Sequence, residues 1–104
     1  MIKGNVFKIK EGKKEVWEKW CFSIQNNYKK EAIETLVEEK FSRETFLLFE
    51  NNSEYFTVGI GEFEQEPLPP NMEKEINQKH KEKKKECLEY IGPISVMYDL
   101  KTLE

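Results

Sequence analysis

The residue with the clearest potential for chemistry is His80, the only histidine in the sequence. On a helical wheel at about 100° per residue, residues 71–91 place His80 at the centre of an apolar stripe, between Ile76 and Cys87. An imidazole with an unperturbed pKa near ~6.5 could transfer protons or orient a ligand in a cleft. The alternative is a core histidine satisfied by a backbone carbonyl or a water.

Glu44 is the carboxylate expected to partner His80. It lies early in the apolar segment 42–50 (SRETFLLFE), where a charge is unfavourable unless it is paired or hydrated. A hydrogen bond between the two side chains would satisfy both, fix the tautomer of His80 and raise its pKa. Alternatively, Glu44 pairs with Arg43, Lys40 or solvent at the end of the strand.

Trp20 and Tyr55 are further candidate ligand-binding residues, because aromatic side chains often line pockets for flat molecules. Trp17 and Tyr98 belong to the same group. Aromatic residues at helical or strand spacing also build hydrophobic cores, so both roles remain open.

The charged and sulfur-containing neighbours of His80 are expected to be structural. Lys83 and Lys84 should extend from the edge of the stripe into solvent, with an anion site beside His80 as the alternative. Cys87 lies two helical turns, roughly 10 Å, from His80, too far for a Cys–His pair. Cys21 and Cys87 are too few and too widely spaced for a metal motif, so we expect neither metal nor cofactor.

Composition restricts the possible partners. The 104 residues carry 17 basic and 20 acidic side chains, a net charge of −3. Nucleic-acid binding requires a basic surplus, and glutamates of the same segment offset the lysines of the basic run 81–85. No apolar run approaches the length of a membrane span, and the N-terminus lacks the apolar core of a signal peptide. We therefore expect no nucleic-acid or membrane partner and a cytoplasmic location.

Hydrophobic periodicity predicts the elements that must position these residues. A strand is expected at 5–10, and helical spacing follows from 13 to 40 with a break at Asn26-Asn27. A hairpin is expected from 42–50 and 55–63, then a proline-rich loop at 64–70. Asn71 should cap a helix over 71–91 that Gly92-Pro93 ends, with the last strand at 94–100.

This order predicts a single α+β domain over residues 1–104 with the ferredoxin-like βαββαβ arrangement. Its four-stranded antiparallel sheet should carry both helices on one face. Segment 42–50 is apolar on both faces, so the second face of its sheet also needs a cover. The chain has no further element to supply one, and we therefore expect a homodimer through the open sheet face.

The segments FKIKEGKKE (7–15), EAIETL (31–36) running into Glu44, and INQKHKEKKKEC (76–87) resemble an uncharacterised bacterial family of small ferredoxin-like proteins, a domain of unknown function. Glu44, His80 and Cys87 match the acidic, histidine and cysteine positions of that family. Lys83 and Lys84 depart from it, since relatives are more apolar or aromatic there. The resemblance implies a dimeric α+β barrel and no established activity.

These observations support three hypotheses for function. The leading one is a homodimer that binds a small organic molecule in a cleft between helix and sheet, with His80 and Glu44 at its polar end. The second is cofactor-independent oxidation or isomerisation with His80 as the base. The third is a structural or interaction module in which His80 is sealed in the core.

Overall fold

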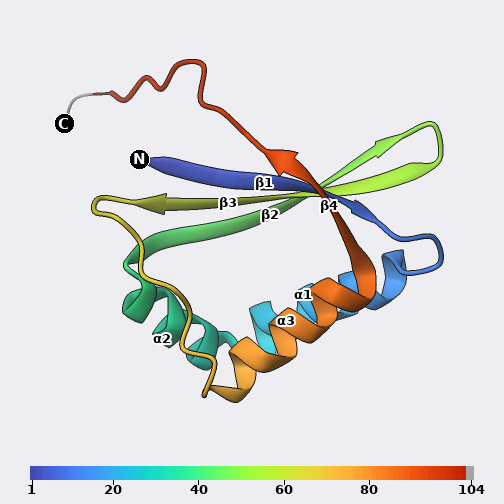
Figure 1. Ribbon diagram of the computed structural model, residues 1–104, viewed down its shortest axis with the longest axis horizontal. Helices are drawn as coiled ribbons and strands as arrows, with labels where there is room; N and C mark the ends of the chain where they lie inside the picture. Colours follow the sequence, from blue (N-terminus) through green and yellow to red (C-terminus); the bar gives the residue numbers. More distant parts are fainter. Residues whose placement is uncertain (103–104) are drawn as a thin grey trace.

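The computed structural model describes residues 1–102 as a four-stranded sheet with three helices on one face (Figure 1). The strands lie in the order β2-β3-β1-β4, and every neighbouring pair is antiparallel. The fold is ferredoxin-like α+β, as predicted. In chain order the elements are β1 (Ile2–Ile9), α1 (Lys14–Asn26), α2 (Lys29–Glu39), β2 (Phe41–Asn51), β3 (Glu54–Phe63), α3 (Glu75–Cys87) and β4 (Leu88–Pro93).

The β2–β3 hairpin is the longest paired region, running from Asn51 opposite Glu54 to Phe41 opposite Phe63. Its turn residues Asn52 and Ser53 adopt φ values of 52° and 65°. Positive φ at both central positions gives the turn that matches the right-handed twist of the flanking strands. The predicted hairpin is confirmed.

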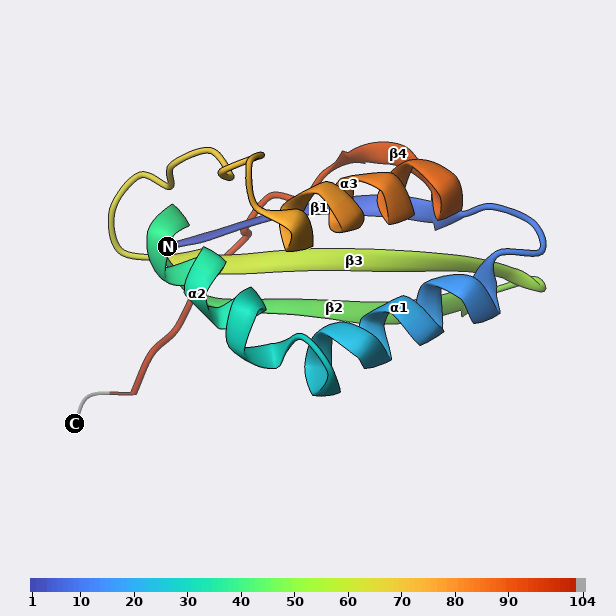
Figure 2. The same ribbon diagram turned by 90° about the horizontal axis from the view of Figure 1, so that it is seen from below.

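The predicted break at Asn26-Asn27 is also confirmed, and it divides the helical region into α1 and α2. The backbone N–H groups of Asn27 and Tyr28 both donate to the carbonyl of Ser23, each at 2.8 Å. Figure 2 shows α1 and α2 beneath the β2 side of the sheet and α3 beneath the β4 side. Because of the break, the helical region packs along the β2 side of the sheet as two separate helices.

The third helix is shorter than predicted, and the last strand begins where that helix ends. Cys87 closes α3, and Leu88 is already extended, with φ −120° and ψ 144°. The carbonyl of Cys87 accepts a 2.7 Å hydrogen bond from the N–H of Lys10, which anchors this junction to the end of β1. Pro93 is tolerated in β4 because β4 is an edge strand. Gly92-Pro93 thus ends a strand, not a helix.

The prediction of a strand at 94–100 was wrong. The chain leaves β4 after Pro93, and Ile94 donates one backbone hydrogen bond to Gly4, at 3.0 Å. Beyond it the segment pairs with no strand in the described chain. Its β-forming residues instead lie exposed, in a segment that departs on the side of the sheet opposite the helices (Figure 1).

Asn71 does not cap α3, which begins at Glu75 with Lys74 in the N-cap position. The Asn71 side-chain Oδ1 accepts a hydrogen bond from the N–H of Glu73 at 3.0 Å, and its carbonyl accepts one from Lys74 at 3.2 Å. These bonds close a turn before the helix. The cap residue was therefore assigned one turn too early.

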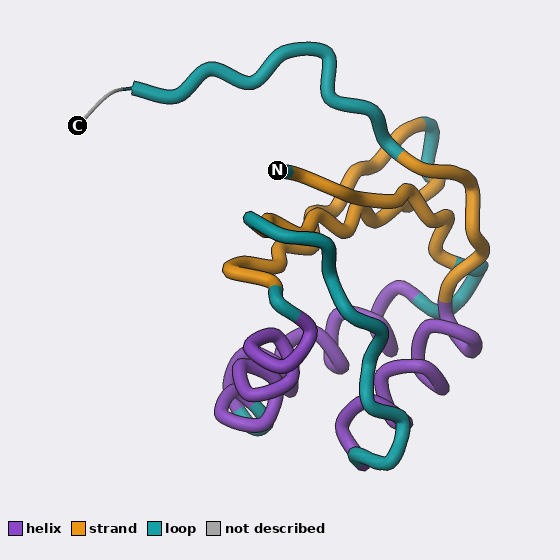
Figure 3. The backbone as a smooth tube through the Cα atoms, turned by 60° about the vertical axis from the view of Figure 1, so that its left-hand side comes forward, coloured by secondary structure: helices purple, strands orange, loops and turns teal. Residues whose placement is uncertain are grey.

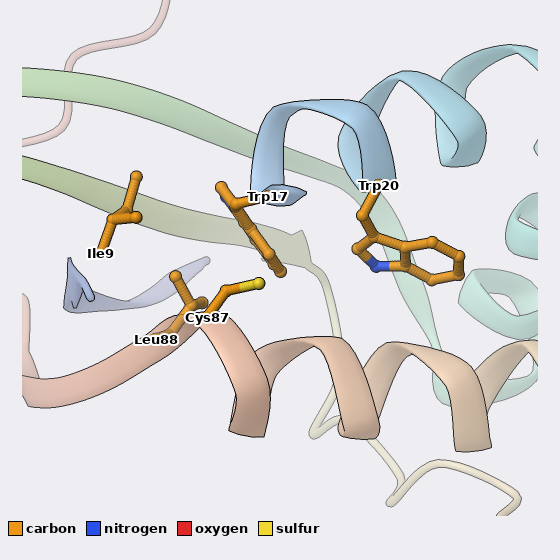
Figure 4. Packing of buried hydrophobic residues seen from close by; sticks show 5 residues of the cluster. All are labelled: Ile9, Trp17, Trp20, Cys87 and Leu88. Carbon is orange, nitrogen blue, oxygen red and sulfur yellow. The ribbon is translucent and has the colours of Figure 1, made fainter. Parts of the chain in front are cut away.

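The tightest packing lies where α1, the end of β1 and the α3–β4 junction meet. Two tryptophans of α1 reach this cluster, and Cys87 is fully buried within it (Figure 4). Aromatic side chains supply much of the buried area in a chain with little aliphatic material. The members of the cluster are Ile9, Trp17, Trp20, Cys87 and Leu88.

Strand register divides the sheet residues between two faces. Phe46, Gly59 and Asn5 align on the helix-covered face, where Phe46 packs against Trp17. The alternate positions form the face away from the helices, which we call the open face. The apolar residues of the open face on β1, β2 and β3 are Ile2, Val6, Leu47, Phe49, Phe56, Val58 and Ile60.

Candidate functional site

Two hollows lie on the helix-covered side of the sheet, and Glu44 lines both. The helix hollow, of about 300 Å³, is bounded by α1, α2, α3 and the start of β2. The sheet hollow, of about 450 Å³, is bounded by β1, β2, β3, α3 and the proline-rich loop 67–70. Figure 3 shows that loop passing from β3 to α3. Glu44 thus borders both concave regions.

His80 lines the helix hollow from α3, together with Glu44. Its ring centroid lies 6.1 Å from the ring centroids of Trp17, Trp20 and Phe46, so aromatic side chains surround it. The Trp20 indole Nε1–H donates a 2.9 Å hydrogen bond to His80 Nδ1. Figure 4 shows the indole nitrogen facing α3. This bond fixes the orientation of the imidazole.

The bond from Trp20 also assigns the tautomer of His80. Indole N–H only donates, so Nδ1 must be the accepting nitrogen, and the neutral ring carries its hydrogen on Nε2. Every buried side-chain nitrogen and oxygen in the described chain has a hydrogen-bond partner, whereas Nε2 has none there. Nε2 therefore reaches accessible space, where its N–H can donate to a ligand or to water.

Burial, followed by the positive charge of Lys84, lowers the pKa of His80 to about 4. Both effects disfavour the charged imidazolium. The sequence-based expectation of a raised pKa was wrong, because no hydrogen bond joins His80 to Glu44 within residues 1–102. At neutral pH, His80 is an uncharged hydrogen-bond donor.

Glu44 faces the helices, on the same side of β2 as Phe46. Much of its surface is accessible to water, yet it lies within a concavity, and this burial raises the pKa of its carboxyl while Lys84 partly opposes the rise. Burial and the nearby charge of Glu44 also raise the pKa of Glu39. Arg43 does not pair with Glu44, because it points to the open face, with Nε 3.9 Å from Glu62.

The sheet hollow depends on two glycines opposite aromatic side chains. A Cβ on Gly59 would come within 2.7 Å of the Phe46 ring, and one on Gly61 within 2.6 Å of the Phe41 ring. The glycines let both rings lie directly over the backbone of β3, a close approach of the kind expected for glycine within a strand. The rings thereby form the floor of the hollow.

The two lysines beside His80 differ in their surroundings. Lys83 pairs with Glu86 at 3.3 Å and extends outward, as predicted. Lys84 lines the sheet hollow, with Nζ 5.0 Å from the centroid of the Phe7 ring. Its charge acts on both His80 and Glu44. Lys84 therefore lies at the site, where the sequence left an anion site beside His80 open as the alternative to extension into solvent.

The other aromatic candidates lie elsewhere or act indirectly. Tyr55 lines a separate hollow of about 570 Å³ near the β1–α1 turn, with Lys14 Nζ 5.0 Å from its ring centroid. Trp20 is buried and reaches the site through its bond to His80. Tyr98 is exposed, and Cys87 is sealed in the core. The structure thus brings His80, Glu44 and Trp20 together and leaves Tyr55 apart.

Sequence reasoning missed Phe46 as a wall of the site, because the pattern identified Phe46 only as an apolar strand residue. The Gly59-x-Gly61 pattern opposite the Phe-rich strand was the available signal. No three His, Cys, Asp or Glu side chains within residues 1–102 are grouped to hold a metal ion.

Comparison with known proteins identifies the family. The model of a family of unknown function, DUF6176, matches residues 3–104, and the chain belongs to that family. No curated protein and no solved structure matches the chain. In the part of the chain that the structure describes, no helix is long and apolar enough to cross a membrane.

Proposed function

We propose that this member of the DUF6176 family binds a small organic molecule in the helix hollow, with His80 and Glu44 at its polar end. The observation that carries the proposal is the 2.9 Å hydrogen bond from Trp20 to His80, which leaves Nε2–H available beside an accessible hollow. A histidine with a purely structural role would have both nitrogens satisfied within the core. Here one nitrogen is fixed and the other is free to donate.

The groups around the hollows indicate the chemistry of the ligand. Nε2–H of His80 requires an acceptor, such as a carbonyl or carboxylate oxygen. Lys84 adds positive charge nearby, and Glu44 can accept a hydrogen bond from a ligand hydroxyl or amide. The remaining walls of the helix hollow include the aliphatic side chains of Ile24, Ile33 and Leu36. A compact molecule with an apolar body and a polar, acceptor-bearing end fits this arrangement.

No observation favours the enzymatic alternative, a cofactor-independent oxidation or isomerisation with His80 as base. The lone pair on Nδ1 already accepts the bond from Trp20, and Nε2 carries a hydrogen. A base must offer a free lone pair to the proton it removes. In this tautomer the histidine is suited to orient a ligand, not to deprotonate it.

The proposal includes a homodimer in the cytoplasm. Leu47 and Phe49 of the open face lie on the edge strand β2, and each is more than half exposed. A second copy would cover them. Both Cys21 and Cys87 are unpaired thiols, which is typical of a reducing compartment.

A thermal-shift screen against small aromatic and aliphatic carboxylic acids, amides and phenols tests the site. Compounds that raise the melting temperature of the wild-type protein should lose that effect in His80→Ala. The matched control is Lys81→Ala, an exposed position on the same helix, which should retain it. Equal shifts in His80→Ala and wild type, with both folded by circular dichroism, would contradict the proposal.

A further inference from the structure

Two exposed apolar surfaces lie on the side of the sheet opposite the helices. One is the open face. The other is the C-terminal arm, which we define as residues 95–102. Figures 1 and 3 show the arm leaving β4 on that side and projecting away from the body of the chain. The arm contains four large apolar residues, and three of them are more than 80 % exposed: Met97, Tyr98 and Leu100, with Val96 about half exposed.

The arm begins at a defined point on the open face. The backbone N–H of Ile94 donates to the carbonyl of Gly4 at 3.0 Å, and the Ile94 side chain occupies the space above that glycine. A Cβ at Gly4 would come within 2.8 Å of the Ile94 side chain. The start of the arm is therefore fixed to β1.

We propose that the open face and the C-terminal arm together form the interface between two copies of this chain, with each arm packed against the partner subunit. This inference rests on the homodimer of the proposed function and assigns a role to the arm. Under two-fold symmetry, identical surfaces meet, so each copy offers the same apolar centre and the same arm. Both exposed surfaces are then covered by one association.

The size of the sheet explains why the arm is needed. Strands of 8, 11, 10 and 6 residues present a face of roughly 570 Å² at ~4.8 Å spacing and ~3.4 Å rise per residue. A standard interface buries about 800 Å² on each partner. Burial of Tyr98 alone would add on the order of 150 Å². The sheet face and the arm together reach the area that a stable dimer requires.

The charges of the open face favour a second copy over a partner of opposite charge. Lys8 pairs with Glu54 near one end of the face, and Arg43 lies near Glu62 at the other. The basic side chains thus lie beside acidic ones, and neither sign dominates. Two such faces do not repel each other, and no strong field is present to attract a charged macromolecule.

Sedimentation equilibrium of the full chain and of a chain ending at Ser95, which lacks all four large apolar residues of the arm, tests the proposal. The full chain should be dimeric at micromolar concentration, and removal of the arm should raise the dimer dissociation constant at least tenfold. A double variant of the full chain, Met97→Asp with Tyr98→Asp, should have the same effect and avoids any consequence of truncation for folding. The matched control is Phe22→Asp, an exposed aromatic position on α1, which should leave the constant unchanged.

Three outcomes would overturn the proposal. They are a monomeric full chain at all concentrations, an unchanged dissociation constant without the arm, and tighter association without it. The last would mean that the arm covers its own open face. Ligand-induced thermal shifts report on the helix hollow and sedimentation on the arm, so the two proposals can fail independently.

Discussion

The two ends of the layer between helices and sheet are filled in different ways. At the end where β1 finishes, Trp17 packs with Ile9, Cys87 and Leu88, and no charged side chain enters the cluster. At the opposite end, where β1 begins, Glu44 lies between two hollows. The first end has the composition of a hydrophobic core. The second retains polar groups beside space that its own side chains do not fill.

The hollows at the polar end are present because of its glycines and because of the space between the helices. Gly59 and Gly61 supply no side chains of their own, and the rings of Phe46 and Phe41 occupy the space above them. The loop 67–70 encloses the hollow from outside, held by a 3.0 Å hydrogen bond from the N–H of Leu68 to the carbonyl of Glu39. A hollow of about 570 Å³ also opens near the packed end, at the β1–α1 turn, but the buried side chains of Trp17 and Cys87 do not line it. The difference shows how a small domain can hold both a core and a site.

The largest expected loss of stability is at the packed end, the end of the layer where β1 finishes. Trp17→Ala removes a side chain that is 3 % exposed, and it should lower the free energy of unfolding by about 3–5 kcal/mol, the range for large-to-small substitutions at buried aromatic residues. Urea denaturation followed by circular dichroism measures the change. A loss below about 1 kcal/mol would mean that this end is not the main source of stability.

The second-largest loss of stability is expected on acidification, because His80 resists protonation in the fold. The pKa of His80 in the fold is about 4, below its ordinary value of 6.5, so the unfolded chain binds a proton first as the pH falls. Stability should therefore decrease between pH 6.5 and 4. We expect a loss of about 1–2 kcal/mol, less than the full linkage value, because water reaches the hollow beside the ring. The decrease in the free energy of unfolding with falling pH should be less steep in His80→Gln.

Unfolding curves at several pH values within that window measure the effect. The other carboxylates titrate in both proteins, so the comparison between wild type and His80→Gln isolates the histidine. Parallel pH profiles for the two proteins would contradict the lowered pKa.

The smallest change in stability is expected on substitution of Glu44. Its pKa is raised in the fold, so the folded state holds its proton to higher pH than the unfolded chain, and the ionised carboxylate opposes folding above that range. Glu44→Gln should stabilise the protein at pH 7, by less than about 1 kcal/mol because water reaches the carboxylate. The gain in stability should vanish below the pKa of the Glu44 carboxyl in the unfolded chain, near pH 4. Destabilisation at pH 7 would show that the charge is satisfied in the fold.

Local signals in the sequence were sufficient for much of the fold. The Asn51-Asn52-Ser53 turn lies between two β-rich segments, and the Asn26-Asn27 pair interrupts a helical period, so the hairpin and the helix break were predictable. The α3–β4 junction was not. Cys87 and Ile91 continue the apolar stripe of the helix, and no glycine or proline separates helix from strand. The end of the helix is instead set by the backbone bond between Cys87 and Lys10, a tertiary contact.

The site was predictable only in part. The central position of His80 on its stripe correctly brought it to the helix–sheet interior, beside Glu44. Its partner was not predictable, because the bond to Trp20 joins residues 60 positions apart in the chain. The bond leaves Nε2 of His80 as the hydrogen-bond donor, whereas burial and the charge of Lys84 reverse the expected direction of the pKa shift. Long-range packing, not local pattern, decides the chemistry of this ring.

The state of His80 is the most direct test of this account, and a single histidine makes it accessible. A long-range ¹H–¹⁵N spectrum of the imidazole should show the Nε2–H tautomer and no titration until the pH approaches about 4. Trp20→Phe, which removes the indole donor, should allow the tautomers to mix. An Nδ1–H tautomer in the wild-type protein, or a midpoint near the ordinary value of 6.5, would contradict the assignment of His80 as a fixed, neutral donor facing the helix hollow.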